Sequence, residues 1–419
     1  MGTGITLCIM SHRSFQSEVR TLSNTKDMSR REFVAAAALS ALRLPGARTL
    51  TVEAGRFDRR DVVVSFAVPD GFDGKWMLRD QSGKTTPLQI DAAQASFVLP
   101  DLKSGKTKQY RIVPSSASDM YVKATADERL LRVTSGAGRI FDFRLQRELP
   151  EPAIKEAFKR AGYMHPVYSP SGRVITDDYP SDHYHQHGIM FAWTKTEFEG
   201  RHPDFWNMGN GSGSVEFDGI ADSWSGPVHA GFTARLRYVD LSAPKPVNVL
   251  NEVWFVRAYV VQSGSKAHTI FDIDSTQRTA GSSPLLLPDY RYGGIAVRGH
   301  RNWRKKENVS FLTSEGKDRL GGDDTRARWC AIFGNVDGAV AGIAAFGHPD
   351  NFRAPQPVRI HPDDPYFNFS PSKLGDWRID PGKPYVSRYR FVAFDGAADA
   401  AELDRLWNDY ANPPKVSIG

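Results

Sequence analysis

The chain has 419 residues, of which 40% are hydrophobic and 24% charged, an ordinary composition for a globular protein with a sizeable core. The formal net charge is +6, and residues 1–47 alone carry six basic and three acidic side chains, so the remainder is close to balance. This charge does not indicate a nucleic-acid partner or an anionic membrane surface. No run approaches 18 apolar residues, so no membrane span is expected.

The first 47 residues have the features of an export signal. Arg30 and Arg31 are followed by Phe33 and by an alanine-rich segment at residues 35–42 that is too short to span a bilayer. This arrangement resembles a twin-arginine signal, with Met28 as the true start and a periplasmic or secreted product. The alternative is a short amphipathic N-terminal helix. Only Cys330 follows the signal, which excludes an internal disulfide and a cysteine-based zinc site.

Residues 48–117 contain short strand-like segments separated by Gly, Pro, Asp and Ser turns at intervals of about ten residues. This spacing predicts a small antiparallel β-sandwich domain. Nothing in this stretch looks catalytic, so a structural or carbohydrate-adhesion role is expected for it.

Residues 121–419 continue with strand-like runs almost to the end and show no repeat of fixed period. We expect helices only at residues 153–160 and 397–410. An all-β chain is therefore predicted, in which a large antiparallel β-supersandwich with a C-terminal helix follows the small sandwich.

The most distinctive motif is SDHYHQHG at residues 181–188. In an extended strand, alternate residues point to one face, so His183, His185 and His187 would form one row with Asp182 and Tyr184 on the other side. Three chemistries would use such a row. It would bind a divalent metal through its imidazoles, transfer protons near neutral pH, or form a passive polar rim.

Further candidates surround this motif. Aromatic residues interleaved with Asp, Asn and His between residues 165 and 225 are typical of a sugar pocket. Glu252 lies at the start of an apolar strand, where we expect its carboxylate to cap a neighbouring turn rather than to act as a general base. The other candidate ligand-contacting side chains are Trp206, Tyr292, Arg298, His348, Arg353 and Arg359.

The motifs at residues 165–172, 182–188, 204–206, 292–294 and 348–351 resemble a bacterial family of unknown function labelled "methane oxygenase PmoA". The resemblance covers roughly residues 120–395. It implies a fold similar to the galactose-mutarotase-like supersandwich, an architecture that mostly binds or processes carbohydrates. The family often has His-Arg where this chain has Gln186 and His187, which favours His183 and His185 as the functional pair.

We therefore predict an exported enzyme with acid–base chemistry, of lyase, epimerase or hydrolase type, on a sugar or uronate. His183 and His185 would exchange protons with the substrate, with Asp182 beside them. Arg298 or Arg353 would hold an anionic or hydroxyl-rich group, Trp206 would stack on the ring, and Tyr184 or Tyr292 would protonate a leaving oxygen. A carbohydrate-binding protein without turnover and a metal enzyme using His183, His185 and His187 are the alternatives.

Overall fold

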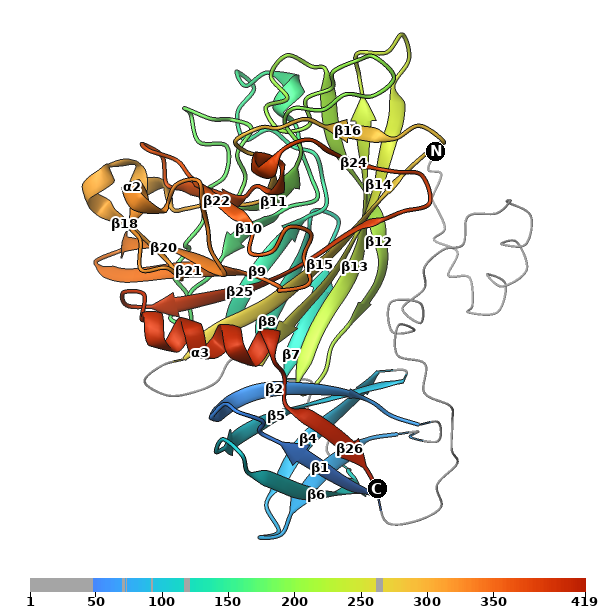
Figure 1. Cartoon of the computed structure of the whole chain (residues 1–419), viewed down its shortest axis with the longest axis vertical. Helices are drawn as coiled ribbons and strands as arrows, with labels where there is room; N and C mark the ends of the chain where they lie inside the picture. The colour runs from blue at the N-terminus through green and yellow to red at the C-terminus, as the bar shows by residue number, and fades with distance from the viewer. Residues whose placement is uncertain (1–47, 70–71, 73, 92, 117–120, 261–266) are drawn as a thin grey trace, which may run out of the picture.

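A computed structural model describes residues 48–69, 72, 74–91, 93–116, 121–260 and 267–419 (Figure 1). Strands account for most of this part of the chain, which confirms the all-β prediction. The expected export signal lies outside the described residues. No helix in the described ranges is long and apolar enough to cross a membrane.

The N-terminal strands form one curved antiparallel sheet, shown in blue in Figure 1. Alternate residues of these strands are buried around a core of their own that includes Val64, Leu78 and Phe97, as expected for strands with one face on a core. In hydrogen-bonded order the described strands are β2 (Arg59–Ala67), β5 (Gln94–Leu102), β4 (Thr85–Asp91), β3 (Trp76–Asp80), β6 (Thr107–Pro114), β1 (Thr49–Glu53) and β26 (Lys415–Ile418).

The last strand of this sheet comes from the other end of the sequence. β26 pairs with β1 in antiparallel register, with Leu50 opposite Ile418 and Glu53 opposite Lys415. The predicted boundaries placed these C-terminal residues in the larger unit. The difference arises because Val416 and Ile418 pack on the small core, a long-range contact that no local pattern signals.

Two larger antiparallel sheets follow. Over the described strands, the first has the order β19 (Thr325–Arg326), β22 (Pro357–Ile360), β23 (Tyr366–Phe369), β17 (Gly294–Arg298), β11 (Ile189–Ala192), β10 (Met164–Val167), β9 (Gly138–Arg144), β8 (Leu130–Ser135) and β7 (Val122–Ala126). The second has the order β12 (Gly213–Trp224), β13 (His229–Asp240), β14 (Val247–Tyr259), β15 (His268–Thr279), β25 (Tyr385–Asp395), β21 (Ala339–Gly347), β20 (Trp329–Val336) and β18 (Val309–Thr313). A short pair, β16 (Leu285–Leu287) and β24 (Trp377–Ile379), lies beside them.

The two large sheets share one hydrophobic core. Phe141 and Phe143 of β9 contact rings of the facing sheet, with centroids 4.9 Å apart for Phe141 and Phe271 and 6.1 Å for Phe143 and Trp254. Each buried aromatic side chain removes about 150–250 Å² from water, so such contacts dominate the stability of the pair of sheets.

The C-terminal helix α3 (Ala400–Ala411) confirms the helix predicted at residues 397–410. Asp399 caps it by accepting from the backbone N–H groups of Ala401 and Glu402. Its residues Leu403 and Leu406 pack on Phe346 and neighbouring side chains of the second large sheet. The short helix α2 (Arg319–Gly322) lies in a loop.

The helix predicted at residues 153–160 is wrong, since only a 3-10 turn, η2 (Glu156–Phe158), forms there. The segment is pulled out of helical geometry because Arg160 is fully buried. Its Nη2 donates to the carbonyl of Phe191 at 2.8 Å and its backbone N–H donates to Tyr179 Oη at 3.1 Å.

Side chains connect the small sheet to the large ones. Arg59 of β2 forms a buried ion pair with Asp409 of α3, at 2.8 Å between Nη1 and Oδ1. Gln89 of β4 donates to the carbonyl of His229 at 3.0 Å and accepts from the backbone N–H groups of Val228 and His229. These buried polar contacts hold the two parts in a defined arrangement.

Candidate functional site

The candidate site lies at one end of the first large sheet, where antiparallel strands begin and end together. Ile189, at the start of β11, is opposite Val297, and Arg298, the last residue of β17, is opposite Tyr366 at the start of β23. β22 ends at the same edge before the loop that returns as β23. Residues 181–188, 298–304 and 361–364 therefore meet, although they are far apart in the sequence.

Residues 181–188 do not form the predicted extended strand. His183 N donates to Pro180 O at 2.8 Å, and Gln186 N donates to His183 O at 2.9 Å, so two consecutive turns replace it. The strand β11 begins only after Gly188, where a Cβ atom would lie 2.1 Å from Met164 O. The prediction of one histidine face is wrong for this reason.

His187 is separated from the other two histidines and is fully buried. Its Nδ1 lies 2.7 Å from Asp178 Oδ1, and its ring stacks on Tyr163 at 4.4 Å between centroids. Tyr179 contacts the same ring edge-on at 4.5 Å. His187 therefore packs in the interior, and the metal set of His183, His185 and His187 is not assembled.

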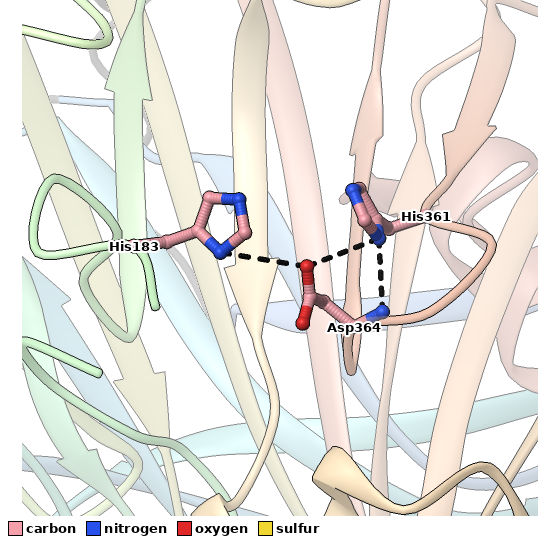
Figure 2. Close-up of side chains that lie close together, drawn as sticks. All are labelled: His183, His361 and Asp364. Carbon is pink, nitrogen blue, oxygen red and sulfur yellow. Dashed lines mark hydrogen bonds and ion pairs between the residues drawn. The ribbon is translucent and has the colours of Figure 1, made fainter. Parts of the chain in front are cut away.

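His183 instead meets two residues of the loop between β22 and β23 (Figure 2). Asp364 Oδ2 lies 3.4 Å from His183 Nδ1 and 3.1 Å from His361 Nδ1. One ligand atom of each of these three side chains lies within 4.8 Å of the others. The backbone N–H groups of Asp363 and Asp364 donate to His361 Nδ1 at 3.2 and 2.9 Å, which fixes the orientation of that ring.

Asp182 and Asp364 form a carboxyl pair beside these imidazoles. Burial alone would raise the pKa of Asp182, but Arg298, the hydrogen bond with Asp364, and Arg304 together lower it to about 2. Burial and that hydrogen bond raise the pKa of Asp364. The two carboxyl groups therefore differ in acidity, with Asp182 the stronger acid.

Burial keeps the imidazoles of His185 and His361 uncharged at physiological pH. Burial, then the charges of His183 and His187, lower the pKa of His185 to about 3. Burial, then Arg359 and His183, lower the pKa of His361 to about 4. The His183 and His185 rings are 5.5 Å apart between centroids, so the predicted pair does lie together.

Arg298 is almost completely buried at this edge, with 1% of its surface exposed. Its Nη1 donates to Gln186 Oε1 at 2.7 Å, and its Nη2 lies 3.5 Å from Asp182 Oδ1. Arg304 Nη2 approaches the same Asp182 oxygen at 3.0 Å. The prediction that Arg298 faces the histidine motif agrees with this geometry.

The aromatic candidates lie close by but are packed differently from the prediction. Trp206 is 1% exposed, and its ring is covered by Tyr292 at 5.6 Å and by Tyr366 at 5.8 Å. It therefore cannot offer an open stacking face. Tyr292 is half-buried and donates to Asn207 Oδ1 at 3.3 Å. Tyr184 is half-buried, with its ring 5.8 Å from Phe158.

Arg353 and Arg359, two other candidates, have structural partners elsewhere in the fold. Arg353 Nη1 donates to the carbonyls of Pro371 and Gly375, both at 2.8 Å, and so ties a loop together. Arg359 is buried and pairs with Asp323 at 2.5 Å.

His348 lines a cavity of about 170 Å³ beside α3, together with Trp407. The ring of Tyr410, also in α3, is 5.1 Å from the His348 ring.

Glu252 is likewise interior, with 1% of its surface exposed, rather than the cap of a turn. Ser275 Oγ, Gln277 Nε2 and Tyr238 Oη donate to its carboxylate at 2.5, 3.0 and 3.0 Å. Burial raises the pKa of Glu252 against the effect of these donors. Its polar groups are satisfied between the sheets, away from the histidine cluster.

The sequence-based reasoning missed His361 and Asp364. The available signal is the segment HPDDP at residues 361–365, a polar turn between two apolar strand segments. Such a loop places its side chains at a sheet edge, and the pairing of β17 with β23 brings that edge to Arg298.

The chemistry open to this arrangement follows from its dimensions. Two-carboxylate glycosidases hold their carboxyl groups about 5–9.5 Å apart, whereas Asp182 and Asp364 are hydrogen-bonded to each other. Two imidazoles and one carboxylate that converge, with positions left open, are instead a common set for divalent transition metals. His183, His361 and Asp364 are the described residues that would hold such an ion.

The fold and site thus define an all-β protein with a His-His-Asp cluster at a sheet edge. The chain belongs to DUF6807, a family of unknown function, whose sequence pattern matches residues 131–408 and so includes the whole cluster. No curated protein sequence matches the chain.

Two solved structures are similar to the chain, both at 7% sequence identity. They are an alpha-mannosidase from Enterococcus faecalis V583, with a TM-score of 0.44, and a protein in glycosyl hydrolase family 38 from Enterococcus faecalis, with a TM-score of 0.42. Each likeness covers 89% of this chain but only 46% and 47%, respectively, of the larger protein, so the chain spans about half their length.

Proposed function

We propose that this protein is a divalent-metal-dependent enzyme that acts on carbohydrate, with the ion held by His183, His361 and Asp364. One observation carries the proposal: a ligand atom from each of these side chains lies within 4.8 Å of the others. His185 and His187 of the expected histidine row are thereby replaced by a histidine and an aspartate from a distant loop.

The surroundings of the cluster support a metal-binding role. His361 is held in place by two backbone N–H groups, and Asp364 follows in the same tight loop. His183 Nδ1 is buried and makes no hydrogen bond to the described residues. Rigid ligands with open positions are what a catalytic metal site needs.

The metal would polarise a carbonyl or hydroxyl oxygen of the substrate, a role shared by metal-dependent epimerases, lyases and hydrolases. A sugar is supported by the rings beside the cluster. An aromatic wall runs from His361 through the buried Tyr366 and Trp206 to Tyr292, with the rings of His361 and Tyr366 6.3 Å apart. The half-buried rings at its two ends, His361 and Tyr292, are the ones that a sugar could contact. Apolar ring faces with a few fixed polar groups suit a pyranose.

Metal content is the test. The full chain is purified, stripped with a chelator and titrated with Zn²⁺ and Mn²⁺ by calorimetry, with elemental analysis of the untreated protein. We expect the protein to contain about one equivalent of a divalent ion. Its affinity for that ion should be at least about 100-fold weaker in His183→Ala, His361→Ala and Asp364→Asn, because each substitution removes a bond to the metal. His202→Ala is the matched control, since its ring contacts Thr196 O instead.

A metal content below about a tenth of an equivalent, together with no saturable metal binding in the titration, would refute the proposed metal site. Acid–base chemistry by His183 and His185 would then be the remaining enzymatic assignment. Stoichiometric metal with no turnover on a broad oligosaccharide panel would instead identify a carbohydrate-binding protein.

We also propose that the two large sheets are a galactose-mutarotase-like supersandwich and that the chain is exported from Met28 by a twin-arginine route. The shared core of the two sheets supports the first part, and the Arg30-Arg31 signal supports the second. Cell fractionation tests export: replacing both arginines by Lys should retain the protein in the cytoplasm. Unchanged export would refute the twin-arginine route.

A further inference from the structure

The arginines around the cluster differ in how completely their donors are used. Arg353 donates to three backbone carbonyls, and Arg359 pairs with Asp323. Arg298, in contrast, makes one hydrogen bond, to Gln186, while its Nε and Nη2 have no hydrogen-bond partner among the described residues. A guanidinium group has five N–H donors, so most of those of Arg298 remain unused.

Leaving such donors buried is costly, because each has lost its hydrogen bonds to water. Burial also lowers the pKa of Arg298, against the effect of Asp182, Asp364 and Asp177. The backbone of Arg298 is nevertheless held in place on both sides. Its backbone N–H donates to Gly188 O at 2.7 Å, and its carbonyl accepts from Asp177 N at 3.2 Å.

The carboxylates near Arg298 leave part of its guanidinium group without hydrogen bonds. Asp182 Oδ1 lies 3.5 Å from Arg298 and 3.0 Å from Arg304, so one carboxylate faces two guanidinium groups. The contact with Arg298 is too long for a hydrogen bond, whereas Arg304 is closer and 42% of its side chain is exposed at the rim. Asp182, Asp364 and Asp177 all offset the charge of Arg298, but none of them hydrogen-bonds its Nε or Nη2.

We infer that the substrate is a sugar acid, whose carboxylate binds the unused Nε and Nη2 side of Arg298 while Asp182 stays with Arg304. This inference rests on the proposed carbohydrate function and names its substrate class. A carboxylate matches the planar fork of a guanidinium group and accepts two parallel hydrogen bonds, whereas a neutral hydroxyl accepts from one donor. The sugar ring would then extend toward His183 and the aromatic wall.

The test compares D-glucuronate with D-glucose by calorimetry, in metal-loaded and in chelator-treated full-length protein. We expect glucuronate to bind at least about tenfold more tightly than glucose, and Arg298→Lys to weaken glucuronate by about ten- to a hundredfold, because it keeps the charge but loses the fork. Glucose binding should change little. Arg378→Gln is the control, since this exposed arginine pairs with Asp380.

Should Arg298→Lys fail to fold, as judged by circular dichroism, the exposed Arg304→Gln replaces it, with an expected two- to fivefold loss for glucuronate, roughly that of an exposed ion pair. Equal affinity for glucuronate and glucose in the wild type would overturn the inference. Inorganic phosphate is the probe for an anion without a sugar. Phosphate binding as tight as that of glucuronate would also overturn it.

The two metal states separate this inference from the proposed function. A glucuronate preference that survives in metal-free protein supports the role of Arg298 even if metal binding fails. Stoichiometric metal without that preference would leave the metal site standing and remove the sugar-acid assignment.

Discussion

Replacing His187 by Ala separates the structural histidine of the motif from the functional ones. His187 is fully buried, its Nδ1 is 2.7 Å from Asp178 Oδ1, and it stacks on Tyr163 at 4.4 Å. Truncating a buried ring of this size costs about 3–5 kcal/mol. The lost hydrogen bond to a carboxylate is worth about 1.5–3 kcal/mol within that total.

The same substitution at His183 should cost less than about 1 kcal/mol, because 31% of its side chain is exposed and its neighbouring rings, His185 and His361, are 5.5 and 5.8 Å away rather than stacked on it. Thermal unfolding of both variants is followed by circular dichroism at pH 7.5. At about 2 °C per kcal/mol for a chain of this size, His187→Ala should lower the Tm by at least about 6 °C and His183→Ala by less than about 2 °C.

The effects of these two substitutions on metal affinity should follow the opposite order. His187→Ala should bind metal normally at a temperature where it is folded, whereas His183→Ala should not. His187→Gln keeps an N–H donor near Asp178 and should recover part of the lost stability. If His187→Ala unfolds at the temperature of the wild type, or loses metal as His183→Ala does, the separation of the motif into two roles is refuted.

Three further outcomes follow from the fold. Burial lowers the pKa of His165 to about 4. As the pH falls, the unfolded chain, with a histidine pKa near 6.5, is protonated at this position before the folded chain is. The contribution of His165 to stability is therefore fully present above about pH 6.5 and falls by about 1.4 kcal/mol per pH unit down to pH 4. Between pH 7 and 5, urea unfolding should show about 2 kcal/mol more loss for wild type than for His165→Gln, and equal losses would contradict the assignment. Asp409→Ala leaves the buried Arg59 without its carboxylate partner and should cost about 3–5 kcal/mol, against little change for Asp350→Ala, which removes an exposed ion pair with Arg388. Deleting residues 413–419 should expose the edge of β1 and increase proteolysis within residues 48–117 relative to the large sheets; unchanged cleavage would show that β26 is dispensable.

The fold class was predictable because strand signals are local. Turn residues every ten positions and alternating apolar residues mark the strands of both parts, and the apolar side of α3 includes Leu403 and Leu406. The false helix at residues 153–160 has a helical local pattern, but the burial of Arg160 overrides it. Propensity alone does not register such a tertiary contact.

The site was only partly predictable. His183, His185, Asp182 and Arg298 do lie together, and the spacing of the motif together with the glycine-rich strand before Arg298 pointed to them. The assumed strand geometry failed because two turns occupy residues 180–186, which rotates His187 into the interior. Asp364, in contrast, is 364 − 183 = 181 residues away from His183, and only the order of β11, β17, β23 and β22 brings them together.

The pairing of β26 with β1 has a consequence for synthesis. Glu53 pairs with Lys415, which is 415 − 53 = 362 residues later in the chain. β1 can therefore pair with β26 only after all of the intervening residues have been synthesised. At about 5–20 residues per second, a ribosome needs roughly 20–70 s to cover that interval. During that time β1 has its neighbour β6 on one side and an unpaired edge on the other. The small sheet can therefore close only after residues 415–418 have been synthesised.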